Sequence, residues 1–244
     1  MQIAILECNT DDSVMARRHP SLGQLMAEGL GRERPGWTIT RWAASQGELP
    51  SEAAVFDAVL LSGSVASAND EAPWMLALEA LVRRRHAARQ AIGGLCFGHQ
   101  LIAKALGGQV GPSPGGWRVG VAPTHITAPQ PWMQPAQPLV QLHAVHQEQV
   151  LAPPPGVVVI GGDDHAPVGA MVAGRHLFTT QYHPELPTAF LDDLYTLLGD
   201  HFPPEVVARG RVAITRPEPT RDAALVFRWL AQWIEQAQDR QMSA

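Results

Sequence analysis

The sequence has few cysteines, no long apolar run and no excess of basic residues. Cys8 and Cys96 are its two cysteines in 244 residues, and a chain of this length needs no disulfide framework to bury a core. We therefore expect a reducing compartment, the cytoplasm by default, although the sequence leaves a pairing of these two residues open. No stretch approaches the about 18 consecutive apolar residues of a transmembrane helix. The N-terminal MQIAILECN lacks the basic and apolar regions of a signal peptide, so the sequence indicates no membrane partner.

Charge and missing motifs exclude further classes of function. The formal net charge is −5, which indicates no basic surface for nucleic acid. The sequence contains no G-x-x-x-x-G-K-[ST], no H-E-x-x-H and no paired C-x-x-C, so it lacks a phosphate-binding loop and the common zinc motifs. His143 with His146, and Asp163, Asp164 and His165, come nearest to a metal-ligand cluster, but loop or structural roles are the stronger interpretation. We predict no metal and no cofactor.

Short apolar runs alternate with amphipathic stretches in the first half of the chain. The predicted strands lie at residues 3–7, 37–42, 56–61 and 91–94, and the predicted helices at 21–31, 73–89 and 98–106. We expect the strand at 37–42 to lie at an edge and the helix at 21–31 to stop at Gly31. Strands that alternate with helices favour an α/β fold with a mostly parallel central sheet and helices on both faces.

The second half of the chain is richer in β-structure. Frequent prolines between residues 109 and 155 exclude long helices there. Short strands are predicted at 119–121, 139–145, 157–160, 170–173 and 177–181, helices at 187–198 and 222–238, and a connector at 211–221. We therefore predict one domain over residues 1–244, with a core of about 1–186, a small β-rich portion and a C-terminal helical extension at 187–244.

Cys96 lies in the segment that predicts a nucleophile. Gly94 to Gly98 has the form G-x-C-x-G, the thiol counterpart of the strand-to-helix turn G-x-S-x-G, in which glycines allow a sharp bend that points the central side chain outward. The helix that follows directs its partially positive first-turn amides at the sulfur, which favours a thiolate and offers donors to an oxyanion. The alternative is that Cys96 is a small buried hydrophobic residue, which is the usual fate of a free cysteine.

His183 and Glu185 supply the groups that such a nucleophile needs. A cysteine requires a base that removes its proton and later delivers a proton to the leaving group, and the base requires an orienting partner. In an extended backbone, side chains two residues apart point to the same side, and Pro184 stiffens the link between them. The alternative is a loop histidine beside a surface glutamate. The predicted strand before the motif, and the elbow at Cys96, favour a triad.

Two motifs carry a resemblance to a known family. G-L-C-F-G-H-Q at residues 94–100 and Q-Y-H-P-E at residues 181–185 are similar to the motifs of the class I, or triad, glutamine amidotransferases, whose domain is flavodoxin-like. The resemblance implies that Cys96 is the nucleophile, His183 the general base and acid, and Glu185 its orienting residue. It covers Ile3 to about Leu186.

The same resemblance implies further site residues. Backbone amides of Phe97 and, in the loop after an earlier strand, Gly63 would form the oxyanion hole. Gln100 and His146 would help to bind the substrate. The loop at 62–67, SGSVAS, departs from the family's Gly-Gly-Pro-Ser form and is similar instead to stand-alone, GMP-synthase-like members. The sequence V-H-Q-E at 145–148 matches the family's S-H-x-D loop only loosely, which leaves the choice of substrate open.

The expected reaction is hydrolysis of the side-chain amide of glutamine through a cysteinyl thioester, which releases glutamate and ammonia. Two alternatives remain: the same triad acts on a γ-glutamyl peptide or amide, or the chain is a non-catalytic regulatory subunit. Because the sequence holds no nucleotide-binding loop of a synthetase, any synthetic use of the ammonia requires as partner a separate, ammonia-accepting synthase subunit.

Overall fold

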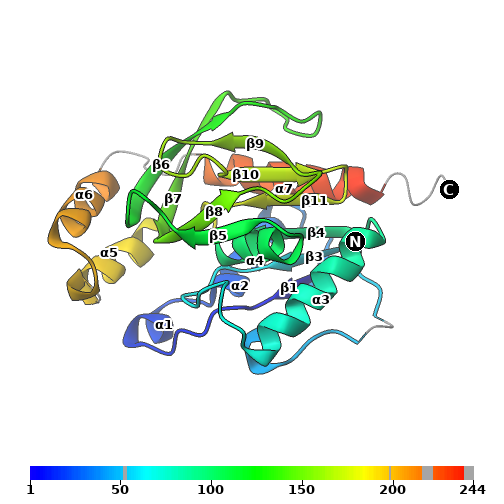
Figure 1. The fold of residues 1–244 in the computed structure, drawn as a ribbon, viewed down its shortest axis with the longest axis horizontal. Coiled ribbons are helices and arrows are strands. Elements are labelled where there is room, and N and C mark those ends of the chain that lie inside the picture. Colours follow the sequence, from blue (N-terminus) through cyan, green and yellow to red (C-terminus); the bar gives the residue numbers. More distant parts are fainter. Residues whose placement is uncertain (52–53, 198, 216–221, 239–244) are drawn as a thin grey trace.

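The computed structural model describes residues 1–51, 54–197, 199–215 and 222–238. Figure 1 shows the arrangement of the elements. The strands are β1 (Gln2–Leu6), β2 (Thr38–Trp42), β3 (Ala58–Leu61), β4 (Ala91–Leu95), β5 (Gln109–Pro112), β6 (Arg118–Ile126), β7 (Leu139–His146), β8 (Glu148–Ala152), β9 (Val158–Gly162), β10 (Ala170–Ala173) and β11 (Leu177–Thr180). The helices are α1 (Val14–Arg18), α2 (Leu22–Glu33), α3 (Pro73–Ala87), α4 (Phe97–Ala105), α5 (Thr188–Leu197), α6 (Pro204–Ile214) and α7 (Ala223–Gln238), with short 3-10 helices η1 (Ala44–Gln46) and η2 (Gly199–His201).

In the described part of the chain, nine strands form one sheet in the order β2-β1-β3-β4-β11-β10-β9-β6-β7. The first five of these pair in parallel, and the remaining neighbours pair antiparallel. The predicted α/β fold with a large central sheet is confirmed, and β2 lies at the edge as expected. Strands β6, β7, β9, β10 and β11 of the β-rich second half continue the large sheet, whereas β5 and β8 pair separately.

Helices cover both faces of the parallel half of the sheet. Successive residues of a strand point to opposite faces: Ile3 and Ile5 pack in a cluster with α2 and α7, whereas Ala4 and Leu6 pack in a cluster with α3 and α4. In Figure 1, α3 and α4 lie in front of the sheet and α7 lies behind it. The C-terminal helix α7 therefore completes the main core, with Trp229 and Trp233 fully buried.

Two predictions about elements were wrong, and one pair of strands was missed. Helix α2 does not stop at Gly31 but continues to Glu33, because its cap forms one turn later, where the amide of Arg34 bonds the carbonyl of Leu30. The predicted connector at 211–221 begins inside helix α6, and residues 216–221 lie outside the described residues. Gly210 lies inside α6, and a glycine in the interior of a helix weakens the sequence signal for that helix. The glycine is needed there because the ring of Tyr195 occupies the space of a Cβ. The pair β5 and β8, which forms a separate two-stranded sheet, was not predicted.

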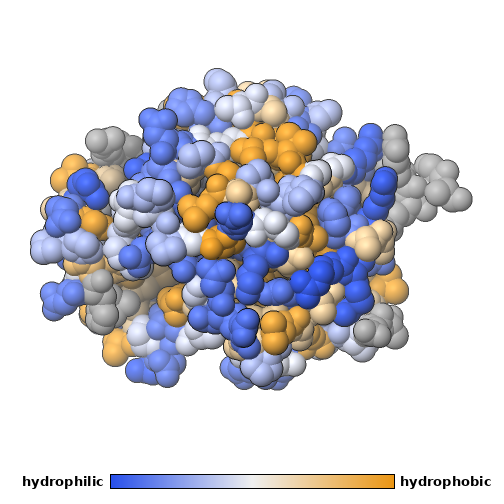
Figure 2. All heavy atoms as spheres, in the orientation of Figure 1, coloured by the Kyte–Doolittle hydropathy of each residue, from blue (hydrophilic) through white to orange (hydrophobic). Residues whose placement is uncertain are grey.

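The face shown in Figure 2 carries both hydrophilic and hydrophobic residues. Hydrophilic residues cover most of this face, and hydrophobic residues gather near its upper centre, over β8, β9 and β10. Leu151 of β8 and Val158 of β9 are about half exposed, at 47% and 53%. Among the residues placed by the structure, no helix is both long enough and apolar enough to span a membrane.

Candidate active site

Cys96 alone separates strand β4 from helix α4. Its φ of 49° and ψ of −103° lie outside the regions that residues with a side chain ordinarily adopt, and such strain concentrates at functional sites. The turn is so tight that a Cβ on Gly94 would lie 2.5 Å from the carbonyl carbon of Gly98. The predicted nucleophile elbow is therefore present in its geometry: the thiol stands at the N-terminus of α4, where the helix dipole favours negative charge.

The parallel pairing of β4 with β11 brings the second motif to the same place. Thr180, the last residue of β11, pairs with Leu95, and the amide of Cys96 donates a hydrogen bond to the carbonyl of Thr180 at 2.9 Å. Because both strands end at the same edge of the sheet, the residues after β11 emerge beside the cysteine. His183 is then fixed from the other side, since its amide donates to the carbonyl of His143 in β7 at 2.8 Å.

The side chains of Cys96, His183 and Glu185 meet. Nδ1 of His183 lies 2.7 Å from Oε1 of Glu185, and the Cys96 side chain interacts with the ring of His183 beside the same cavity. The side chains of His183 and Glu185 are 5% and 0% exposed. Burial by itself lowers the pKa of His183, but the charges of Glu185 and Cys96 and the hydrogen bonds to both raise it well above 6.5. The arrangement therefore favours the protonated, imidazolium form of His183.

Gln181 is a site residue to which the sequence pattern gave no role. Its Nε2 donates to Sγ of Cys96 at 3.5 Å, and its Oε1 accepts from Nε2 of Gln100 at 3.1 Å. The same Nε2 of Gln100 donates to the carbonyl of Glu148 at 2.7 Å. The one signal in the sequence was the position of Gln181 as the first residue of Q-Y-H-P-E. Gln181 therefore connects the sulfur to Gln100, and Gln100 connects it to β8.

The other predicted site residues lie around the triad. Phe97 is the first residue of α4, and its buried ring packs 5.7 Å from that of Trp74. Gly63 lies so close to His183 that an added Cβ would be 3.1 Å from the ring. Gln100 and His146 both line the cavity at the cysteine. Their roles in binding an oxyanion or a substrate stay predictions.

His146 is buried, and neither of its ring nitrogens has a hydrogen-bond partner among the described residues. Burial is the main cause that lowers the pKa of His146 to about 3, and the nearby His183 and His165 add to the effect. The ring is therefore neutral at pH 7, which makes His146 a neutral wall of the cavity and not a second cation beside His183.

A cavity of about 420 Å³ opens at Cys96, a volume typical of small-molecule sites. One part of its wall is polar and contains Ser64, Ser67 and Glu148; Oγ of Ser67 donates to Oε2 of Glu148 at 2.7 Å. The other part is apolar and includes Trp117, Phe190 and Phe202. No pattern in the sequence indicates a shared role for these three aromatic residues, because they belong to segments far apart in the chain.

His143 and Asp163, from the two candidate metal-ligand groups, make contacts within the fold. Nδ1 of His143 lies 2.8 Å from the carbonyl of Leu186. Asp163 pairs with Arg118 at 3.3 Å and accepts from the amides of His165 and Ala166. Within the residues that the structure describes, no group of three or more histidine, cysteine, aspartate or glutamate side chains is placed to hold a metal. Cys8 and Cys96 are both free thiols, so they do not form a disulfide.

Comparison with known proteins agrees with this architecture. A family model described as glutamine amidotransferase class-I matches residues 8–190. The chain belongs to the class I glutamine amidotransferase family, whose members are generally cysteine-dependent amidohydrolases.

Three relatives illustrate the range of the family. Gamma-glutamyl peptidase 2 of Arabidopsis thaliana is 27% identical over 189 residues, 75% of each chain. A glutamine-hydrolyzing GMP synthase subunit of Sulfolobus acidocaldarius is 33% identical over 94 residues, 38% of this chain and 50% of that protein. The crystal structure of a glutamine amidotransferase from Thermotoga maritima superposes with a TM-score of 0.73 over 96% of this chain and 98% of the other, at 17% identity. At that identity the superposition establishes the fold alone.

Proposed function

We propose that the protein hydrolyses the γ-carbonyl C–N bond of glutamine or of a related γ-glutamyl compound through a thioester on Cys96. One observation carries the proposal. The ends of β4 and β11 bring together a strained cysteine, a histidine and a glutamate, of which the cysteine and the histidine line a cavity. A thiol, an imidazole and a carboxylate in this relationship are the parts required for covalent acyl transfer.

Each group has one task in the proposed reaction. The thiolate of Cys96 attacks the γ-carbonyl carbon, and a C–S bond forms as the carbonyl electron pair moves to oxygen. When the pair returns, the C–N bond breaks and the imidazolium of His183 gives its proton to the departing nitrogen. Water then attacks the thioester, neutral His183 takes the proton from the water, and the C–S bond breaks. Glutamate leaves, and the thiolate and imidazolium are restored.

The oxyanion and the glutamyl group are assigned to the polar part of the site. The amide of Phe97, at the start of α4, and the amide of Gly63, in the loop after β3, are the proposed oxyanion donors. Gln100 and His146, which line the cavity, are proposed to contact the glutamyl group. Gln181 is proposed as a positioning residue, because it donates to the sulfur from a side chain that also contacts Gln100.

Two observations bear on the substrate. The similarity to a glutamine-hydrolyzing GMP synthase subunit supports glutamine as donor and a separate synthase as ammonia acceptor, but it covers 38% of this chain. The similarity to a gamma-glutamyl peptidase covers 75% and favours hydrolysis of larger γ-glutamyl compounds as the second candidate. Both candidates use the same acylation of Cys96 and differ in the group that leaves.

Glutamate release tests the shared step. Wild-type protein is incubated with glutamine and with a panel of γ-glutamyl compounds, and the variant Cys96→Ala is compared with Cys8→Ala, which removes the other free thiol. We expect release by the wild type and by Cys8→Ala, and a loss of about 10³-fold or more in Cys96→Ala. Equal rates in Cys96→Ala and the wild type would exclude the proposed nucleophile.

A further inference from the structure

The cavity at Cys96 has an apolar wall that extends well beyond the triad. Members of this wall come from the N-terminal helices, the segment before β6 and the C-terminal part of the chain: Met15, Leu22, Trp117, Phe190, Leu194 and Phe202. Leu194 and Phe202 lie outside residues 8–190, the range of the family match. We call this set of six residues the apolar wall.

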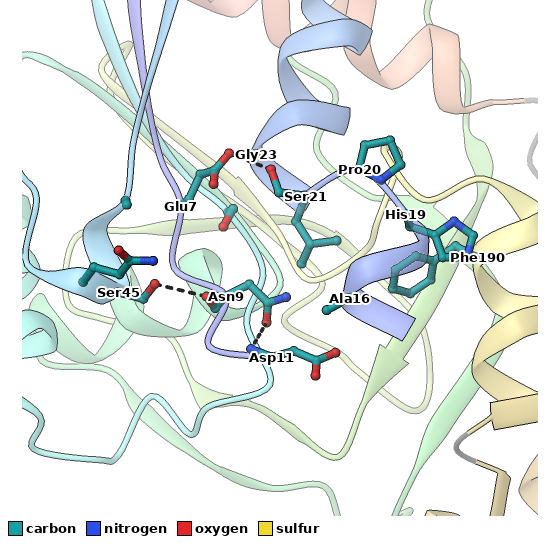
Figure 3. Close-up of a pocket in the computed structure, with 14 residues that line it drawn as sticks. Glu7, Asn9, Asp11, Ala16, His19, Pro20, Ser21, Gly23, Ser45 and Phe190 are labelled. Carbon is teal, nitrogen blue, oxygen red and sulfur yellow. Dashed lines mark hydrogen bonds between the residues drawn. The ribbon is translucent and has the colours of Figure 1, made fainter. Parts of the chain in front are cut away.

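Aromatic contacts and buried neighbours hold the apolar wall in place. The rings of Trp117 and Phe202 meet edge to face with centroids 4.7 Å apart, and the ring of Phe190 lies 5.2 Å from that of His19. Figure 3 shows Phe190 beside His19 and near Ala16, at one side of a smaller pocket that shares Phe190 with the main cavity. Met15 and Leu194 belong to one buried cluster. The wall is therefore a packed surface and not a set of isolated side chains.

The apolar wall would not contribute to binding if the departing group were ammonia. When glutamine is the substrate, the departing group is ammonia, which has no apolar surface to remove from water. The reacting γ-carbonyl and the glutamyl group need the polar part of the cavity. An apolar wall contributes to binding only if the departing amine carries an apolar body of its own.

The charges around the cavity restrict the amine further. Asp11 and Glu148 line the cavity, and the described residues of its lining include no lysine or arginine. The imidazolium of His183 also lines the cavity, but it is engaged by Glu185 and by the reaction. A carboxylate on the departing group, such as that of an amino acid, would therefore lose water without gaining a cationic partner of its own and would face Asp11 and Glu148. The α-carboxylate of the glutamyl group is common to every substrate compared and does not affect this distinction.

We propose that the preferred substrates are γ-glutamyl amides whose departing amine is neutral apart from its nitrogen and carries an aromatic or branched apolar group that packs on the apolar wall. The inference rests on the proposed function and names its substrate class. In the reaction, acylation of Cys96 releases the intact amine, which takes its proton from His183, and water releases glutamate from the thioester. The wall then sets specificity, and the triad performs the chemistry.

The test compares three compounds by kcat/KM: γ-glutamylbenzylamide, γ-glutamylphenylalanine and glutamine. Benzylamine and ammonia are bases of similar strength, so the first and third compounds differ mainly in the ring offered to the wall. We expect the benzylamide to exceed glutamine by about tenfold or more. The phenylalanine compound keeps the ring and adds a carboxylate, and we expect it to fall about tenfold or more below the benzylamide.

Two variants locate the effect on the wall. Phe190→Ala and Phe202→Ala each remove a ring that lines the cavity, and we expect each to lower the ratio of benzylamide to glutamine kcat/KM by about fivefold or more. The matched control is Phe56→Ala, which removes a partly buried ring that packs on the core away from the cavity and should leave the ratio unchanged. A ratio of two substrates on one preparation is insensitive to partial loss of folded protein.

The outcomes separate the two proposals. If the wild type hydrolyses glutamine as well as or better than the benzylamide, the apolar-amine proposal is wrong while the thioester proposal stands. The same holds if neither wall variant changes the ratio. If the wild type turns over none of the three compounds, both proposals are contradicted.

Discussion

Gly98 approaches Leu61 so closely that a Cβ on the glycine would lie 2.5 Å from the leucine carbonyl oxygen. Helix α4 therefore crosses the end of β3 with backbone against backbone. This contact fixes the start of α4, and with it the position of Cys96, relative to the loop that contains Gly63. The second glycine of G-x-C-x-G thus has a packing reason that is independent of the chemistry of the cysteine.

The first prediction concerns this contact. Gly98→Ala forces α4 away from β3, and we expect it to lower the free energy of unfolding by about 1–3 kcal/mol and to reduce activity. Gly31→Ala is the control, because Gly31 lies within α2 and a Cβ there meets nothing within 4 Å. It should raise stability by about 0.5–1 kcal/mol. Urea unfolding of both variants is the measurement, and equal effects would contradict the account.

The second prediction concerns the partner of His183. Glu185→Gln removes the charge that most strongly raises the pKa of His183, so the imidazolium loses its proton at lower pH. We expect kcat/KM to fall about 10²- to 10⁴-fold and the alkaline limb of the pH–rate profile to move to lower pH. Glu28→Gln, at an exposed residue of α2, serves as the control. An unchanged alkaline limb in Glu185→Gln would show that this carboxylate does not set the proton affinity of the ring.

The third prediction concerns stability in acid. Burial is the main cause that lowers the pKa of His99 to about 3, of His146 to about 3 and of His143 to about 4. Between pH 6.5 and about 4 the unfolded chain binds protons at these residues and the folded chain does not. The stability present above pH 6.5 is therefore lost as the pH falls. Each of these histidines changes the free energy of unfolding by at most about 1.4 kcal/mol per pH unit.

His99→Gln tests this linkage. The ring of His99 bonds Thr179 and the carbonyl of Val168 at 2.9 and 3.0 Å, and an amide of similar reach does not titrate. We expect the dependence of unfolding free energy on pH to become shallower by about 1.4 kcal/mol per unit between pH 6 and 4.5. Denaturant unfolding at several pH values measures it. The same slope in variant and wild type would show that His99 binds its proton in the folded state.

The residues proposed for the centre of the site could be named from the sequence because they lie in short motifs. G-x-C-x-G prescribes a tight turn, and H-P-E prescribes two side chains on one side of an extended segment. Their meeting across 87 residues followed from the expected parallel sheet, whose strands end at a common edge. That Gln181 bonds the sulfur was not predictable, since it depends on the rotamer of one side chain at the end of β11.

Features that depend on contacts between distant segments were missed. Helix α6 was missed because Gly210, an unfavourable residue in a helix, is required by the neighbouring Tyr195. Strands β5 and β8 are short and stabilise each other across a separation that no local pattern records. The apolar wall unites residues from position 15 to position 202, and no single segment among them has a pattern that indicates a binding surface.

The most direct test of the central claim is covalent capture of the nucleophile. A glutamine-analogue electrophile is added to the wild type, to Cys96→Ala and to Glu185→Gln, and the products are measured by intact mass and by peptide mapping. The account predicts one adduct on the wild type, located on Cys96, no adduct on Cys96→Ala, and slower labelling of Glu185→Gln. An unlabelled Cys96, or an adduct on Cys8 at the same rate, would contradict it.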